Sequence, residues 1–342
     1  MRLNKFVILA IFFFIESCVP HENSSNQQSD IVVSTDSLAQ IEQEKEPKKR
    51  IIIAANIIIS KDLTYDKYTL EDTYPYKDTV REFQWDKIKE MLAKIENVQQ
   101  DGAQPWGILQ NRKNKNGEAP LVGNWSRNEY KNVADSLGVE RFQGIPLYIL
   151  QDSLISIRYG MDGELVRLNH NTDSTEFVAL QTVYIPGDFM TPRKYVHIID
   201  TIVFNKVAVV DRKNQNITTL EKNGDQWLVR SMNPATTGQH RPPYAHDTPL
   251  GIFVIQEKKE KMYYLVDGTS TLAGYAPWAS RFSNGGYIHG VPTNNPKGRI
   301  IEYSQTLGTI PRSHMCVRNA SSHAQFVYDW AAVAEGLVIV IQ

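Results

Sequence analysis

Apolar residues follow different spacings in successive parts of this chain of 342 residues. The stretch IIIAANIII (51–59) is short and rich in β-branched residues, which predicts a buried strand. Residues 79–98 then place apolar side chains three and four positions apart, the spacing that puts them on one face of a helix. Thr79 and Glu82 form a capping box at the predicted start of this helix.

A second capping box pairs Ser126 with Glu129 and predicts a helix that ends at Gly138. The segment between the two predicted helices reads as a loop, and it contains no motif that indicates chemistry. Together these elements predict a small α/β domain over residues 51–143.

Short strands separated by polar turns replace this pattern from residue 144 onward. The strand-like segments are GIPLYIL, SLISIRYG, GELVRL and EFVALQTVYIPG, and the stretch IPGDFMTPRKYVHII resembles the close of a bacterial SH3-like barrel. Residues 144–199 are therefore predicted to form an SH3-like β domain. Small barrels of this kind usually bind ligands and rarely catalyse reactions.

Strand and hairpin signals dominate residues 200–342. The segment KNGD (222–225) predicts a hairpin turn, and HAQFVYDWAAVAEG predicts a helix before the terminal strand LVIVI. The whole chain is therefore predicted to have a mixed α/β fold that is mostly β, with residues 200–342 as its last domain.

The first 50 residues differ from the rest in composition. A basic start precedes the apolar run FVILAIFFFI (6–15), which predicts a secretory signal because the run is too short to cross a bilayer. Cys18 follows, and the segment resembles a bacterial lipoprotein signal, which implies a signal peptide of residues 1–17 and a lipid on Cys18. A plain cleaved signal is the alternative. Residues 18–50 are rich in polar and charged side chains and predict a flexible tether.

These features predict a periplasmic protein that is anchored to a bacterial membrane, the outer one, through the lipid on Cys18. The formal net charge of -1 gives no general attraction to nucleic acid, so no nucleic-acid partner is expected. With Cys18 lipidated, Cys316 has no partner for an intrachain disulfide, because the chain has two cysteines. A lone thiol in an oxidising compartment is either buried and inert or takes part in a reaction. The polar neighbours of Cys316 favour a reactive thiol.

Thiol catalysis requires a deprotonated cysteine, a base beside it, and N–H groups that face the oxyanion formed on the attacked carbonyl. The last domain contains candidates for these parts. NGGYIHGVP places His289 at the end of a short strand flanked by glycines, and RSHMC places His314 two residues before Cys316. Because positions two apart on a strand share a face, His314 and Cys316 are predicted to line one pocket.

Taken together, these motifs resemble the signature of the L,D-transpeptidases, the YkuD-type cysteine enzymes of the bacterial cell wall. YIHG is similar to the His-Gly strand of the family, and SHMCVRN to its Ser/Thr-His-Gly-Cys segment. Further upstream, TTGQ, DTPLGIF and APWASRF are similar to family motifs in the expected order. The resemblance covers about residues 200–342 and implies a β-sandwich-like catalytic domain there.

The resemblance implies roles for individual residues. Cys316 would be the nucleophile and His289 the base that activates it. The residues that would shape the oxyanion site or bind substrate are His314, Ser313, Arg318, Gly290 and Asn319. Arg318 is suited to a charge-assisted contact with a substrate carboxylate.

The implied reaction is an acyl transfer on peptidoglycan stem peptides, with no cofactor and no metal. Cys316 would attack the bond after the third residue of a stem tetrapeptide, and the terminal D-Ala would leave. An amine of a neighbouring stem would then take the acyl group to give a 3–3 cross-link. Water as the acceptor would instead make the protein an L,D-carboxypeptidase, and the sequence leaves both open because they share the acyl-enzyme.

Two other functions are compatible with parts of the sequence. His289, His314, Cys316 and His323 could be zinc ligands, but they lack the short paired spacings of structural zinc sites. The chain could also be a lipoprotein that binds cell wall without catalysis. The intact cysteine, histidine and arginine argue against this second function.

Met315 stands where the family pattern has glycine, directly before the predicted nucleophile. Because a Cβ makes positive φ costly, the sequence predicts an ordinary extended or helical backbone at Met315. Its side chain would then project into the core or over the substrate channel, where it would narrow the acceptor side.

Overall fold

The computed structural model describes residues 50–342 apart from 101, 103 and 170–175. The predicted signal peptide, Cys18 and the predicted tether up to residue 49 lie outside the described residues. The described part is mostly β, with two α-helices, α1 (Trp85–Gln99) and α2 (Ser321–Trp330), and three short 3₁₀ helices at Ala54–Asn56, Arg112–Asn114 and Arg193–Tyr195. Within it, no helix is both long enough and apolar enough to span a membrane.

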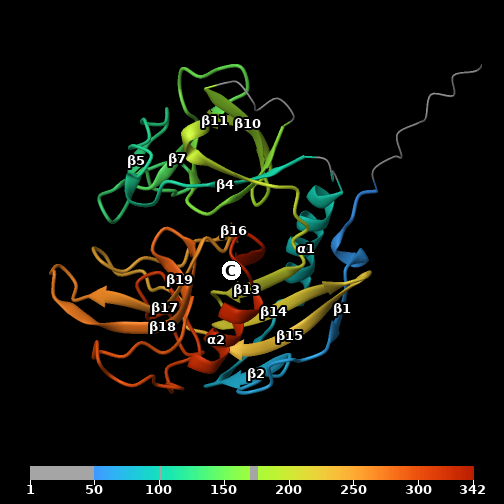
Figure 1. Ribbon diagram of the computed structural model, residues 1–342, viewed down its shortest axis with the longest axis vertical. Coiled ribbons are helices and arrows are strands. Elements are labelled where there is room, and N and C mark those ends of the chain that lie inside the picture. The colour runs from blue at the N-terminus through green and yellow to red at the C-terminus, as the bar shows by residue number, and fades with distance from the viewer. Residues whose placement is uncertain (1–49, 101, 103, 170–175) are drawn as a thin grey trace, which may run out of the picture. The chain divides into compact units, whose positions relative to one another are not determined.

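A six-stranded sheet forms the centre of the C-terminal domain, which we define as residues 205–341 (Figure 1). In spatial order its strands are β1 (Ile58–Lys61), β15 (Gln226–Pro234), β14 (Asn216–Asn223), β13 (Lys206–Asp211), β21 (Gly336–Ile341) and β16 (Gly251–Val254). β21 runs parallel to β13 and β1 parallel to β15, while the other neighbours are antiparallel.

The two central strands are apolar on both faces, which explains why they read as continuous hydrophobic runs. Val207 and Val209 of β13 face one core together with Ile88 and Leu92 of α1. Ala208 and Val210 face a second core on the opposite side of the sheet, where α2 and a second sheet pack. The six-stranded sheet is therefore the middle layer, covered by α1 on one side.

The second sheet has four strands, β17 (Glu257–Leu265), β18 (Leu272–Ser283), β19 (Gly286–His289) and β20 (Val317–Arg318), in that spatial order. β19 and β20 are parallel, and the other pairs are antiparallel. Phe282, Ile288 and Val317 from this sheet fill the second core with Val338 and Val340 of β21. The predicted β-sandwich-like architecture of the C-terminal domain is thus confirmed.

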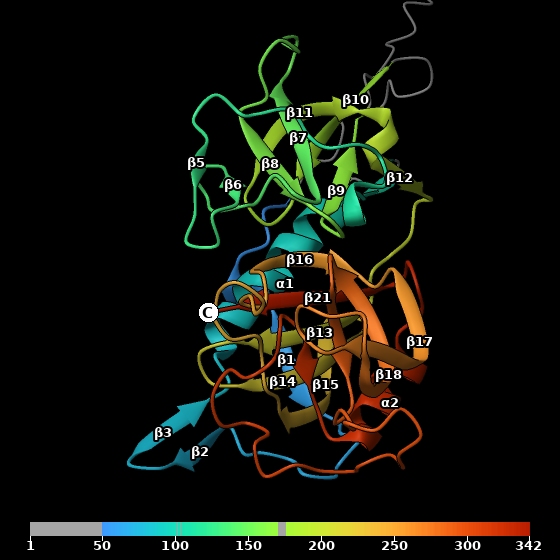
Figure 2. The ribbon, with the colours of Figure 1, turned by 90° about the vertical axis from the view of Figure 1, so that its left-hand side faces the viewer.

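A seven-stranded antiparallel sheet forms what we call the β domain, residues 106–199 (Figure 2). In spatial order its strands are β12 (Val196–Ile199), β4 (Trp106–Leu109), β9 (Leu165–Leu168), β10 (Phe177–Thr182), β11 (Gly187–Pro192), β7 (Gly144–Ile149) and β8 (Arg158–Met161). Its own core includes Leu109, Ile145 and Val166. The strand signals after residue 144 were therefore informative, and the SH3-like identity of this domain stays a prediction.

The predicted α/β domain over residues 51–143 differs from the observed arrangement. β1 extends the six-stranded sheet and α1 covers one face of it, whereas β4 belongs to the β domain. Glu96 of α1 accepts a hydrogen bond from the indole Nε1 of Trp227 at 2.6 Å and pairs with Lys222, which fastens the helix to β14 and β15. The N-terminal segment thus completes the C-terminal domain.

The helix predicted from Thr79 begins at Trp85 instead. Residues Thr79–Glu82 form β3, which pairs with β2 (Thr73–Tyr76) in a hairpin. Asn216 donates a hydrogen bond from its side-chain amide to the carbonyl of Glu82 at 2.9 Å. This contact with a distant strand outweighs the local capping signal, as tertiary contacts commonly do.

The helix predicted over residues 126–138 is wrong. This segment forms a second small hairpin, β5 (Ser126–Arg127) and β6 (Val133–Ala134). The Asn128 side chain accepts the N–H groups of Tyr130 and Asn132, at 3.0 Å each, and Asp135 accepts two more N–H groups downstream. Such side-chain bonds to nearby backbone compete directly with helix formation.

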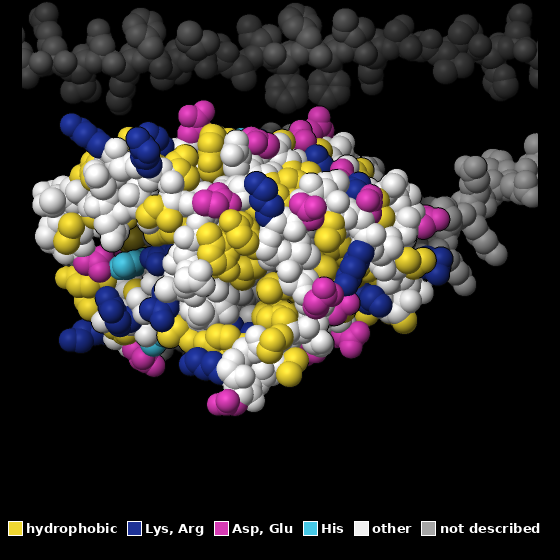
Figure 3. Space-filling view, turned by 90° about the horizontal axis from the view of Figure 1, so that it is seen from below, with side chains coloured by type: hydrophobic (Ala, Val, Ile, Leu, Met, Phe, Trp, Pro, Cys, Tyr) yellow, Lys and Arg dark blue, Asp and Glu magenta, His cyan; other side chains and the backbone are white. Residues whose placement is uncertain are grey.

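On the face of the molecule in Figure 3, acidic, basic and apolar side chains are interspersed, and neither sign of charge gathers into one broad field. This agrees with the formal net charge of -1 for the whole chain.

Candidate active site

Cys316 lies just before β20, and the pairing of β20 with β19 determines its surroundings. The register places Ile288 opposite Val317 and His289 opposite Arg318. The Cys316 thiol donates to the carbonyl of Gly285 at 3.4 Å, and the backbone N–H of Tyr287 donates toward the sulfur. The strand that ends in His289 and the residue just before it therefore also supply the backbone contacts of the thiol.

The turn before the thiol is held from inside by Ser313, which is buried. The Ser313 hydroxyl donates to the carbonyl of Cys316 and accepts the N–H of Met315 at 3.4 Å. The Ser313 N–H donates to the Thr237 carbonyl at 3.1 Å. Ser313 therefore shapes the loop that presents the thiol.

The same turn is also held by Thr248, which is buried and belongs to the DTPLGIF segment. Its hydroxyl donates to the carbonyl of Met315 at 2.7 Å and accepts the N–H of Gly238 at 2.8 Å. A Cβ on Gly238 would lie 2.8 Å from the Met315 Cα, so the glycine permits this close approach.

The ordinary backbone predicted at Met315 is wrong, because its φ is +137°. The hydrogen bonds made by Ser313 and Thr248 on either side impose this conformation despite the Cβ. The Met315 side chain lines a second cavity, of about 520 Å³, and not the cavity that contains Cys316. The hypothesis that Met315 narrows the acceptor side is therefore not supported.

His289 is buried, and its ring is fixed by a neighbouring carbonyl. Nδ1 lies 2.6 Å from the carbonyl oxygen of Gly290. Because a carbonyl only accepts, Nδ1 carries the proton and the lone pair of the neutral ring is on Nε2. Burial lowers the pKa of His289 to about 4, and the positive charge of Arg318 acts in the same direction. The resting imidazole is therefore neutral.

Gly290 allows this arrangement by its lack of a side chain. A Cβ at this position would lie 2.5 Å from the hydroxyl oxygen of Ser321 and 2.8 Å from a ring carbon of Pro277. Gly290 therefore permits close approach of Ser321 and Pro277 to the backbone directly after His289.

The thiol of Cys316 is protonated in the resting site. Burial raises its pKa to about 11, and the Tyr287 N–H and the Arg318 guanidinium oppose this effect. In the resting site both the thiol and the imidazole are therefore neutral, and they do not form a thiolate–imidazolium pair.

Arg318 lies two residues after Cys316 and brings positive charge near the thiol. Burial lowers its pKa, while the proximity of Cys316 and Tyr264 raises it. Its Nε is buried and has no hydrogen-bond partner among the described residues. The guanidinium therefore keeps donor capacity for a bound anion.

Of the remaining predicted site residues, some line the cavity and others lie behind its wall. His314 lines the cavity but is exposed, and its Nε2 lies 2.9 Å from a carboxylate oxygen of Asp267. Asn319 is buried behind the site, where its N–H donates to the carbonyl of His289 at 2.9 Å. The cavity thus brings together Cys316, His289, His314, Ser313 and Arg318, whereas Gly290 and Asn319 support it from behind.

His323, the fourth member of the rejected zinc set, lies in the core. Its Nε2 is 2.9 Å from the hydroxyl oxygen of Ser231 and its Nδ1 is 3.2 Å from the amide oxygen of Asn319. Among the residues that the structure describes, no group of His, Cys, Asp and Glu has an arrangement suited to a metal.

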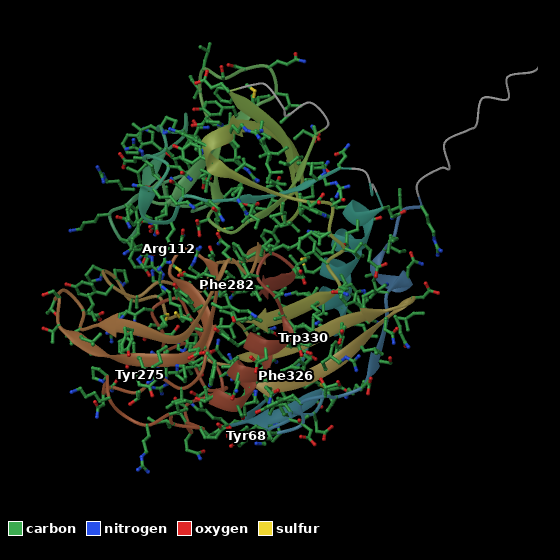
Figure 4. The ribbon with its side chains drawn as sticks, viewed as in Figure 1. Tyr68, Arg112, Tyr275, Phe282, Phe326 and Trp330 are labelled. Carbon is green, nitrogen blue, oxygen red and sulfur yellow. The ribbon has the colours of Figure 1, made fainter. Side chains whose placement is uncertain are left out.

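The cavity around Cys316 has a volume of about 1110 Å³ and several wall residues that sequence reasoning missed. The Lys and Arg side chains in its wall are Arg112, Lys259, Lys261 and Arg318, and its carboxylate is Asp267. Arg112 comes from the β domain, bonds Glu257 at 2.9 Å, and lies 5.8 Å from the Tyr287 ring (Figure 4). The cationic wall suits a substrate that has carboxylates.

The family comparison agrees with the motifs. Residues 205–341 match the model of the YkuD family, described as the L,D-transpeptidase catalytic domain. The C-terminal domain is therefore a YkuD-type L,D-transpeptidase catalytic domain.

Solved structures similar to this chain include three L,D-transpeptidases. One is from Mycobacterium smegmatis, with 17% identity, coverage of 52% of this chain and 77% of that chain, and a TM-score of 0.33. Another is from Mycobacterium tuberculosis H37Rv, with 19% identity, coverage of 52% and 76%, and a TM-score of 0.32. The third is L,D-transpeptidase 3 from Mycobacterium tuberculosis with a faropenem-derived adduct, with 19% identity, coverage of 54% and 76%, and a TM-score of 0.31. The comparison with curated proteins found no match.

The backbone at Met315 can be tested by stability measurements. Met315→Gly should be more stable than Met315→Ala by about 1 kcal/mol, because glycine relieves the positive φ that alanine keeps. Urea unfolding followed by tryptophan fluorescence measures both free energies. At Met262, half-buried in strand β17, the same pair of substitutions should give the opposite order. An alanine variant at 315 as stable as the glycine variant would contradict the observed backbone.

Proposed function

We propose that the protein is a peptidoglycan L,D-transpeptidase in which Cys316 is the nucleophile and His289 is the general base. The observation that carries this proposal is the hydrogen bond from His289 Nδ1 to the Gly290 carbonyl, 2.6 Å long. It leaves Nε2 as the free base of a neutral imidazole, on the strand that borders the thiol.

The first half of the proposed reaction forms a thioester. Cys316 Sγ attacks the carbonyl carbon of the bond after the third residue of a stem tetrapeptide, and the thiol proton passes to His289 Nε2. The tetrahedral intermediate then collapses, the C–N bond breaks, and the amine of D-Ala leaves with the proton from His289. The pKa of about 11 for the Cys316 thiol favours proton transfer during attack over a preformed thiolate.

The second half transfers the acyl group. An amine of a neighbouring stem attacks the thioester and His289 Nε2 takes its proton. The C–S bond then breaks, and His289 returns the proton to the leaving sulfur, which restores the thiol. The product is a 3–3 cross-link. A cavity of about 1110 Å³ exceeds the usual size of a site for one small ligand, which supports room for a donor and an acceptor peptide. With water as the acceptor, the same site would act as an L,D-carboxypeptidase.

Arg318 is the proposed contact for a carboxylate of the donor stem. Its Nε is buried without a hydrogen-bond partner among the described residues, and its charge acts on both Cys316 and His289. A carboxylate bound here would be held beside the reacting bond by a charge-assisted hydrogen bond.

We also propose that the protein works in the periplasm, attached to the outer membrane through a lipid on Cys18. The apolar run at residues 6–15 and the polar segment 18–50 support this location. A tether of this length would allow the catalytic domain to act away from the membrane surface.

The catalytic assignment is tested by incubation with purified muropeptides and mass spectrometry of protein and products. Cys316→Ala should form no acyl adduct. His289→Asn, which is close in size, should acylate on the order of 10²–10⁴ times more slowly, because the base is lost. His197→Ala, at an exposed histidine of the β domain, is the matched control and should acylate at the normal rate. Turnover of tetrapeptide by the Cys316→Ala variant would refute the mechanism.

The anchoring proposal is tested by cell fractionation of the full chain. Cys18→Ala should appear in the soluble periplasmic fraction, with unchanged activity in vitro, because the lipid attachment site is gone. Tight membrane association of the variant would count against a lipid anchor on Cys18.

A further inference from the structure

A cluster of rings and carboxylates joins the β domain to residues 239–248 of the C-terminal domain. We call this cluster the domain clasp. Its members are Glu129 and Tyr130 from the β5–β6 hairpin and His240, His246 and Asp247 from the C-terminal domain.

His240 is bonded to a carboxylate at each ring nitrogen. Its Nε2 lies 2.7 Å from a carboxylate oxygen of Glu129, and its Nδ1 lies 2.9 Å from one of Asp247. Because ionised carboxylates only accept, both nitrogens donate and the ring is an imidazolium. The hydrogen bonds to Glu129 and then Asp247 raise the pKa of His240 above its ordinary value.

Tyr130 adds contacts that do not depend on this charge. Its hydroxyl donates to the carbonyl of Ala245 at 2.7 Å and lies 3.2 Å from Nδ1 of His240. Its ring stacks on His246 with centroids 3.9 Å apart and an interplanar angle of 15°. The hairpin of the β domain therefore holds residues 239–248 at several points.

Other charged groups around the clasp come from both domains. Arg212 of the C-terminal domain bonds Asp247 at 2.8 Å and so shares that carboxylate with His240. Glu140 of the β domain lies 3.8 Å from Nδ1 of His246. Burial lowers the pKa of His246, and the neighbouring His314, which lies beside Asp267, acts in the same direction.

The held segment ends at Thr248, which contacts the turn before Cys316. The Thr248 hydroxyl donates to the Met315 carbonyl at 2.7 Å, where φ is +137°. On its other side, Met315 lines the cavity of about 520 Å³, together with His240, Asp247 and Leu250. Since that cavity leaves room beside Met315, the hydrogen bond from Thr248 restrains the turn at the Met315 carbonyl, while Ser313 restrains it at the Met315 N–H and the Cys316 carbonyl.

We propose that the β domain positions the nucleophile: Glu129 and Tyr130 hold residues 239–248, and Thr248 fixes the backbone at Met315 so that the Cys316 thiol stays beside His289. This inference rests on the proposed function, in which Cys316 is the nucleophile. Glu129, Tyr130 and Thr248 are positioning residues, since they act on the thiol through the turn.

The contribution of His240 to the clasp should depend on pH in a defined direction. Its pKa in the folded protein lies above the value of the unfolded chain, so the ionic stabilisation is fully present below the unfolded pKa. It is lost as the pH rises through the folded pKa. The effect of removing Glu129 should therefore be largest in mild acid and should vanish in alkali.

The test measures alkylation of Cys316 by iodoacetamide in the full chain, by mass spectrometry of the peptide that contains it. Thr248→Val should lower the midpoint of the alkylation pH profile from about 11 toward the ordinary cysteine value of 9.0, because the loosened turn exposes the thiol. Thr248→Ser, which keeps the hydroxyl, should retain the normal midpoint. Thr218→Val is the control: it removes a comparable buried hydrogen bond from a hydroxyl to a backbone carbonyl, and it should leave the midpoint of the alkylation pH profile unchanged.

Glu129→Gln tests the link from the β domain. At about pH 6 its Cys316 should be alkylated about threefold faster than that of the unaltered protein, as expected for loss of one exposed ion pair. At about pH 9 the two rates should be equal. Glu118→Gln, at an exposed carboxylate of the β domain that pairs with Arg141, should match the unaltered protein at both pH values.

An unshifted midpoint in Thr248→Val, or a Glu129→Gln ratio that is the same at both pH values, would overturn the inference. Acylation by tetrapeptide, measured on the same variants, should fall on the order of tenfold or more in Thr248→Val, because misplaced reacting groups are costly. If the unaltered protein does not acylate at all, the proposed function fails, while the alkylation rates still decide whether the clasp positions the thiol.

Discussion

The parallel pairing of β19 with β20 is the constraint on which the site depends. With Ile288 opposite Val317 and His289 opposite Arg318, the chain places the thiol at the start of one strand and the imidazole at the end of its neighbour. His289 is held in register by the sheet, whereas Cys316, directly before β20, is held by the turn that Ser313 and Thr248 bond. The N–H of Asn319, donated to the His289 carbonyl at 2.9 Å, extends the same ladder behind the site.

This pair of short strands is stable because larger elements pack against it. Ile288 and Val317 are both fully buried in the core between the two sheets, with Val338 and Val340 of the central strand β21. The other face of the central sheet is covered by α1, a segment that lies outside the matched family region of residues 205–341. The N-terminal segment and the catalytic domain therefore share one core, and the β domain adds Arg112 to the cavity wall.

The sequence predicted that Cys316 and His289 lie in one site, and both line the same cavity, whereas it did not predict the supporting parts. Cys316 and His289 lie in short motifs whose residue types suit thiol chemistry, and their catalytic roles stay predictions. Arg112 is brought to the cavity by the fold of another domain, and no local pattern reports this. The capping box at Ser126 failed because Asn128 and Asp135 bond the nearby backbone, and the positive φ at Met315 reflects hydrogen bonds from residues far away in sequence.

The central claim is that a neutral thiol and a neutral imidazole, with Nε2 as the base, form the resting site. The pH dependence of Cys316 alkylation by iodoacetamide in the unaltered protein tests this most directly, because only the thiolate reacts. With a neutral thiol, the rate should rise continuously through neutral pH and level off only near the thiol pKa of about 11. A rate that is already maximal in mild acid would reveal a preformed thiolate–imidazolium pair and would rule out a neutral resting site.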